Sequence, residues 1–67
     1  MANMVEINVT VVRQRDAAVL VEDEGGTQGW VPHSLIDDES EINADSEESD
    51  EGILVIPEWK AEELELE

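Results

Sequence analysis

The first half of the chain alternates between apolar and polar residues as a half-buried β-sheet does. β-Branched residues stand at every second position from Val5 to Val11, which predicts a strand over 5–12 with one buried face. After a polar turn at 13–16, the apolar run 17–21 is too short for a helix and predicts a second strand. The pair Gly25-Gly26 fits a tight turn before a third strand at 27–31, because glycine accepts a positive φ. Residues 4–31 are therefore predicted to form an antiparallel meander.

The remaining apolar residues predict one more strand and a terminal helix. Pro32 ends the third strand because it cannot donate to a ladder, and the next two apolar residues, Leu35 and Ile36, are expected to tuck under the sheet. The run 53–56 predicts a fourth strand. Pro57 suits the first turn of a short helix over 59–66.

These elements predict a mainly β fold with a C-terminal helix, in one small domain over residues 1–67. Four short strands with tight turns fit a small bent antiparallel sheet or an SH3-like or OB-like partly open barrel. The segment 37–51 interrupts this pattern, since nine of its fifteen residues are acidic and three are serines. It is predicted to be a flexible, solvated loop.

The charge count limits the partners that the chain can bind. Nineteen acidic residues against three basic ones give a net charge of −16. Such a chain has no basic patch with which to bind nucleic acid through its phosphates, and an anionic membrane surface is equally unsuitable. The expected partner is therefore a basic protein surface.

The same composition bears on cell compartment and on stability. There is no cysteine, residues 1–4 lack the features of a signal peptide, and no apolar run could span a bilayer, so the expected compartment is the cytoplasm. With no Phe or Tyr, the only bulky rings are Trp30 and Trp59, and both are expected in the core. A homodimer would relieve the shortage of core, although nothing in the sequence requires one.

Catalysis is not predicted. The single histidine, His33, is adjacent to Ser34, and neighbouring side chains usually diverge, so the pair does not suggest a base and its nucleophile. The many carboxylates lie mostly on a loop, whereas acid–base chemistry needs them in a shaped, partly desolvated pocket. No enzyme activity and no cofactor are expected.

The acidic segment and the strand after it resemble two other kinds of site. The spacing of Glu47, Ser49, Glu51, Gly52 and Glu58 resembles a calcium loop, but the first ligand is not Asp and no helix precedes it, so no metal site is predicted. Acids at 45–51 followed by the apolar run 53–56 also resemble a motif that adds a strand to a partner's sheet. The simpler interpretation makes that run a core strand.

Three short motifs resemble those of small phage and prophage proteins. They are the strand 18–21, the Trp-Val-Pro-x-Ser-x-Ile segment at 30–36 and the Ile-Pro-Glu-Trp helix start at 56–59. The resemblance spans residues 5–66, but His33 stands where Lys or Arg is common, and the acidic loop is unusually charged. Because most such proteins have no assigned activity, the resemblance implies a phage-encoded accessory protein acting in the host cytoplasm and implies no reaction.

Charge and resemblance together give a functional hypothesis. The chain is predicted to bind a basic, nucleic-acid-binding host protein as a mimic of nucleic acid, inhibiting a defence nuclease complex of the CRISPR or restriction type. The alternatives are a small phage structural or assembly protein, or a module whose acidity reflects a halophilic cytoplasm. The predicted partner-binding residues are the nine acids of the loop: Asp37, Asp38, Glu39, Glu41, Asp45, Glu47, Glu48, Asp50 and Glu51.

Overall fold

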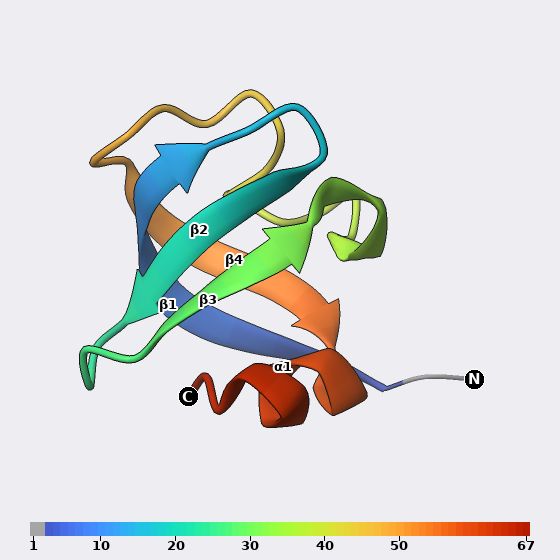
Figure 1. Ribbon diagram of the computed structural model, residues 1–67. Helices are drawn as coiled ribbons and strands as arrows, with labels where there is room; N and C mark the ends of the chain where they lie inside the picture. Colours follow the sequence, from blue (N-terminus) through green and yellow to red (C-terminus); the bar gives the residue numbers. More distant parts are fainter. Residues whose placement is uncertain (1–2) are drawn as a thin grey trace.

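The computed structural model describes residues 3–67, which form one open four-stranded antiparallel sheet and a C-terminal helix (Figure 1). Met1 and Ala2, which belong to the N-terminal segment without signal-peptide features, lie outside the described residues. The strands lie in the order β3-β2-β1-β4. In chain order the elements are β1 (Met4–Gln14), β2 (Ala18–Asp23), β3 (Gln28–Pro32), the 3₁₀ turn η1 (His33–Leu35), β4 (Glu51–Pro57) and α1 (Glu58–Leu64).

The long strand β1 bends and pairs with a neighbour along each edge. Its first part pairs with β4 from Met4 opposite Pro57 to Thr10 opposite Glu51, and its second part pairs with β2. The register with β2 shifts by one residue between Val11 and Arg13. Such a β-bulge bends the strand and increases its twist. Because of this bend, the paired strands β1 and β4 lie behind β2 and β3 in the view of Figure 1.

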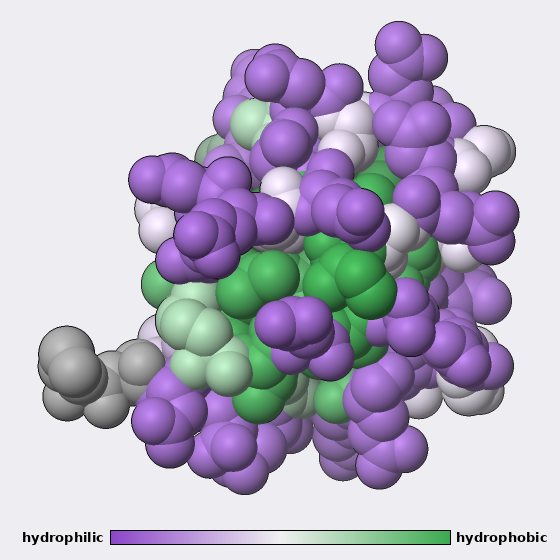
Figure 2. Space-filling view, turned by 180° about the vertical axis from the view of Figure 1, so that it is seen from behind, coloured by the Kyte–Doolittle hydropathy of each residue, from purple (hydrophilic) through white to green (hydrophobic). Residues whose placement is uncertain are grey.

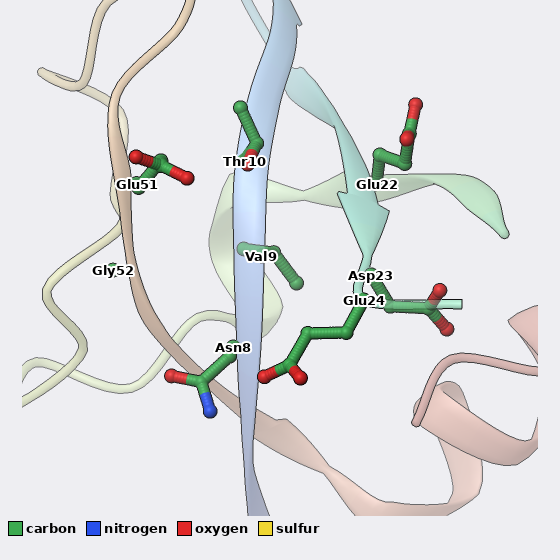
Figure 3. Close-up of a pocket in the computed structure, with 8 residues that line it drawn as sticks. All are labelled: Asn8, Val9, Thr10, Glu22, Asp23, Glu24, Glu51 and Gly52. Carbon is green, nitrogen blue, oxygen red and sulfur yellow. The ribbon is translucent and has the colours of Figure 1, made fainter. Parts of the chain in front are cut away.

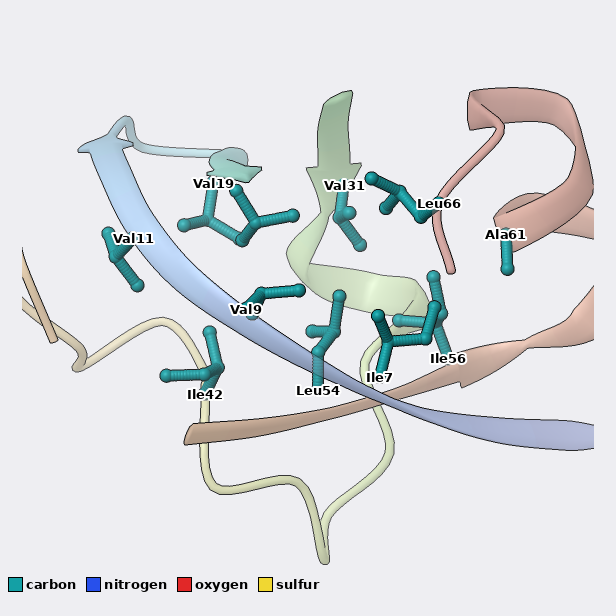
Figure 4. Close-up of a cluster of buried hydrophobic side chains, with 11 residues drawn as sticks. Ile7, Val9, Val11, Val19, Val31, Ile42, Leu54, Ile56, Ala61 and Leu66 are labelled. Carbon is teal, nitrogen blue, oxygen red and sulfur yellow. The ribbon is translucent and has the colours of Figure 1, made fainter. Parts of the chain in front are cut away.

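The core lies on the concave side of this bent sheet and consists almost entirely of aliphatic side chains (Figure 4). Every second strand residue points inward, as the period of a strand requires. Gly29 lets α1 approach β3 closely, because a Cβ there would lie 3.1 Å from two atoms of the Leu64 side chain. The buried apolar residues are Ile7, Val9, Val11, Val19, Val21, Val31, Ile42, Leu54, Ile56, Ala61 and Leu66.

The segment before β4 closes the outer edge of that strand. Ile53 donates its N–H to the Glu41 carboxylate (2.7 Å), and its C=O accepts from the N–H of Glu41 (2.9 Å). The C=O of Val55 accepts from the N–H of Asp37 (2.9 Å). The hydroxyl of Ser40 accepts the remaining group, the N–H of Val55. The outward backbone groups of Ile53 and Val55 are thereby satisfied without a fifth strand.

Ser40 is the centre of this closure. Its Oγ accepts the N–H of Val55 (3.0 Å) and donates to the C=O of Ile42 (2.6 Å), and the residue is only 6% exposed. The next apolar side chain, Ile42, is 2% exposed and reaches the core. The acidic segment is therefore tied to the sheet by a buried hydroxyl and by an aliphatic anchor.

The predicted mainly β fold with a C-terminal helix is confirmed, and the sheet is open and does not close into a barrel. Gly26 has the positive φ expected in the hairpin turn (88°). The helix begins one residue early, at Glu58, and ends at Leu64. The run 53–56 lies within β4, and because its outer edge is closed it is not free to add to a partner's sheet.

The prediction that both tryptophans are buried is wrong. Trp30 is 40% exposed and Trp59 is 52% exposed. In β3 the neighbours Gly29 and Val31 are buried on the core side, so the side chain of Trp30 points to the outer face. Ile42 and Leu66, from the acidic loop and the residues after α1, belong to the core instead.

Replacing Ser40 by alanine should destabilise the fold. The change leaves the N–H of Val55 and the C=O of Ile42 without their partner, which should lower the free energy of unfolding by about 1–3 kcal/mol. Urea unfolding measures this loss. The matched control is Ser34→Ala at an exposed position, which should change the same quantity by less than about 0.5 kcal/mol. Equal effects of the two substitutions would contradict the role given to Ser40.

Candidate functional site

The nine predicted binding residues lie in one connected region beside β4. The residues from Asp37 to Glu41 run along the outer edge of that strand, and Glu51 is its first residue. Between them, the segment 45–50 forms turns next to the end of β1, where Ser49 donates its N–H to the C=O of Val11 (2.8 Å). The fold thus brings the predicted residues to one side of the sheet.

Three of the nine carboxylates serve the fold itself. Asp37 accepts the N–H of Glu39 (3.0 Å), Glu41 accepts the N–H of Ile53, and Asp50 accepts the N–H of Glu47 (2.8 Å). These bonds stabilise local turns and the edge of β4. The other six side chains are exposed and make no hydrogen bond within residues 3–67: Asp38, Glu39, Asp45, Glu47, Glu48 and Glu51.

Gln14, which sequence analysis did not single out, holds the middle of the acidic segment. Its Nε2 donates to the C=O of Ser46 (2.8 Å) and of Asn43 (3.1 Å). Its Oε1 accepts from Nε2 of His33 at 2.6 Å, so the side chain joins β1, η1 and the loop. No sequence pattern signals this contact, because it links positions far apart in the chain. His33 therefore bonds with Gln14, and its neighbour Ser34 is exposed.

Few of the carboxylates are neutralised within the described chain. The single salt bridge of residues 3–67 joins Lys60 Nζ to Glu63 at 2.9 Å. The guanidinium of Arg15 lies 6.0 Å from the ring centroid of Trp30, on the outer face of β3. Within the described chain, no acid of segment 37–51 has an ion-pair partner.

Acids of the β2–β3 hairpin lie near Glu51 of β4, with β1 between them. Thr10 of β1 stands opposite Glu22 on one side and opposite Glu51 on the other. Together with Asp23 and Glu24 these residues line a shallow hollow, and Figure 3 shows Glu22 and Glu51 on either side of Thr10. The hairpin acids therefore continue the acidic surface from Glu51 onto β2.

The arrangement does not resemble a metal centre. Residues 3–67 hold no group of three or more His, Asp or Glu side chains placed to bind a metal ion. The calcium-loop alternative needs one continuous loop from Glu47 to Glu58, but Glu51–Pro57 is an extended strand in this chain.

Asp23 differs from the other acids because it is buried and bonded on both oxygens. Its Oδ2 accepts the N–H of Glu67 (3.0 Å), and its Oδ1 accepts those of Thr27 and Gly25 (2.9 Å each). These backbone bonds, with Glu67 the largest contributor, hold the pKa of Asp23 below its ordinary value of 3.8. Asp23 therefore joins the β2–β3 hairpin to the residues after α1.

Comparison with known proteins adds no relationship: no family model, no curated protein and no solved structure matches the chain. Within residues 3–67, none of the helical segments has the length and apolar character needed to cross a bilayer.

The Asp23 carboxylate should make stability depend on pH. Because its pKa is lowered by folding, its contribution is present above the ordinary aspartate pKa of 3.8 and is lost as the pH falls through the folded-state value. Asp23→Asn should therefore be less stable than the parent at neutral pH, and the difference should shrink in acid. Urea unfolding across the acid range measures it. The control is Glu24→Gln at an exposed neighbouring position. A difference in unfolding free energy between the parent and Asp23→Asn that stays constant down to the lowest pH would contradict the role given to the Asp23 carboxylate.

Proposed function

We propose that this protein binds a positively charged, nucleic-acid-binding surface of another protein through the carboxylates of segment 37–51. The observation that carries the proposal is that this highly charged segment is fixed at three places. Residues 37–42 form hydrogen bonds with β4. The carbonyls of Asn43 and Ser46 accept from the side chain of Gln14. The backbone groups of Ser49 and Asp50 form hydrogen bonds with those of Val11. A merely solvating tail of acids would need none of these bonds.

Carboxylates on a fixed backbone bind a basic surface better than those on a mobile loop for a physical reason. Ordering a loop on binding costs conformational entropy, and a loop that the fold has already ordered avoids part of that cost. A net charge of −16 also steers a cationic partner and raises the association rate at low salt. Both effects support binding to a surface that normally holds nucleic acid.

The finer form of the proposal is inhibition by mimicry. Carboxylates on an ordered surface would occupy a cationic groove in place of phosphates, and the resemblance to phage proteins suggests a defence nuclease complex in the host cytoplasm as the target. This form rests on the resemblance in addition to the charge. It predicts that the protein and DNA compete for one site on the partner.

An apolar assembly surface is the second candidate, and the exposed hydrophobic residues favour it. Met4 is 41% exposed, and the half-buried side chains of Ile53 and Val55 lie on the outer face of β4. Seen from behind, the molecule shows apolar side chains gathered in the middle of one face and rimmed by hydrophilic ones (Figure 2). Patches of this kind mark protein contacts.

Neutralising loop carboxylates separates the two candidates. The variant Asp38→Asn/Glu39→Gln/Glu47→Gln/Glu48→Gln removes four charges that make no internal hydrogen bond. If segment 37–51 is the contact, it should weaken binding to a captured basic partner by about tenfold or more, about 1.4 kcal/mol. The partner is captured from host lysate on the immobilised protein, identified, and titrated as the purified protein in a salt series.

The matched control carries the same loss of charge at Glu6, Glu58, Glu62 and Glu65, which are exposed and lie outside the loop. It should weaken binding by less than about threefold, about 0.7 kcal/mol. DNA should displace the partner, and moderate salt should release it. A partner that stays bound in molar salt, resists DNA and is lost with Met4→Glu would contradict the electrostatic proposal and support the apolar one.

A further inference from the structure

The two edges of the sheet differ in their hydrogen bonding. At β4 the outward groups are covered by residues 37–42, as described above. At β3, the odd-numbered residues direct their backbone N–H and C=O groups toward β2. Two hydrogen bonds at the ends of the ladder show this: the N–H of His33 donates to the C=O of Ala17, and the N–H of Asp23 donates to the C=O of Thr27 (2.9 Å each). In an antiparallel ladder the residues between them point their N–H and C=O groups away from the partner strand.

The outward residues of β3 are Gln28, Trp30 and Pro32. The backbone N–H and C=O groups of Gln28 and Trp30 have no hydrogen-bond partner within residues 3–67. Pro32 has no N–H to offer, which ends the open stretch, as proline does on natural edge strands. The open edge therefore presents four backbone groups over three residues, next to the exposed ring of Trp30.

We infer that the β3 edge accepts an extended segment of a partner protein, which adds to the sheet as a fifth strand. Strand addition uses main-chain hydrogen bonds for affinity and alternate side chains for selectivity. Open edges are normally protected because they pair with other chains. In this protein one edge is closed by a dedicated segment while the other is left open, and the open edge lies across the sheet from segment 37–51, so the inference is independent of the proposed function.

The carboxylates near the start of β3 favour a basic side chain there, whereas Arg15 lies near Trp30 farther along the strand. Glu22 lies beside Gln28, whose Nε2 donates to it at 2.8 Å. Near the start of the strand, Thr27 lines a hollow with Glu62 and Glu65. A Lys or Arg side chain of the added strand would meet these carboxylates, and an apolar side chain two residues away would lie against Trp30. A second copy of this chain is a poorer occupant, because each copy carries a charge of −16.

Synthetic peptides test the inference directly. The probe is a blocked Val–Lys peptide with Thr at every second position and with Val and Lys alternating at the positions between, so that Lys and Val share one face of the strand. A Val–Glu peptide of the same length and pattern controls for charge. A Val–Lys peptide N-methylated along one backbone edge and then along the other controls for strand pairing. Amide hydrogen exchange of ¹⁵N-labelled protein is followed by NMR. The Val–Lys peptide should slow exchange at Gln28 and Trp30 by about tenfold or more, and N-methylation of the pairing edge should abolish the effect.

A substitution in β3 provides the second test. Gln28→Pro removes one outward N–H and leaves the bonds between β2 and β3 intact, so it should weaken peptide binding by about tenfold with little change in Tm. Glu47→Gln/Glu48→Gln, at the other side of the sheet, should leave the slowing of exchange at Gln28 and Trp30 unchanged. If Gln28→Pro fails to fold, the N-methylated peptides still decide the question.

Three results would overturn the inference. The first is equal binding of the parent peptide and both N-methylated peptides, which would show charge attraction without strand pairing. The second is unchanged exchange at Gln28 and Trp30 at millimolar peptide. The third is slowing of exchange at these amides in the free protein that increases with its concentration and with salt, which would assign the edge to a second copy of the chain.

Discussion

The hydrogen bonds between segment 37–42 and the outer edge of β4 are the constraint on which the rest of the structure depends. They satisfy the outward groups of Ile53 and Val55, and the same segment brings Ile42 into the core. Without them the sheet would have two open edges and a smaller core. The most acidic part of the chain is therefore also structural, so its charges cannot be separated from the fold that holds them.

A small core must be stable in spite of repulsion among the surface charges. The chain has no Phe or Tyr, and its two indole rings lie at the surface, so burial depends on Val, Ile and Leu packed inside one bent sheet. Aliphatic side chains contributed from outside the ladder, such as Ile42 and Leu66, make up for part of this shortage. Neutral hydrogen-bonding groups, Ser40 and Gln14, hold the acidic segment in place, and they do so at any salt concentration, unlike ion pairs.

The strands could be predicted from the sequence because a period of two is a local signal. The exposure of Trp30 could not be predicted, because the face on which its side chain lies depends on the register between β2 and β3. The size of the ring suggested burial, whereas the side chain lies on the exposed face. The nine acids could be named from composition, but their division into exposed and structural carboxylates depends on contacts across the chain. The bonds of Gln14 and Ser40 to distant carbonyls and amides have no periodic signature, and they determine where the loop lies.

The central claim is that the acidic segment closes the β4 edge while β3 stays open, and amide hydrogen exchange of the free protein in dilute solution tests both parts at once. The account predicts that the amides of Ile53 and Val55 exchange as slowly as those paired within the β1–β4 ladder, whereas those of Gln28 and Trp30 exchange freely. If Ile53 and Val55 exchanged as fast as Trp30, segment 37–42 would not be holding that edge. The ordered acidic surface, and the function proposed from it, would then be contradicted.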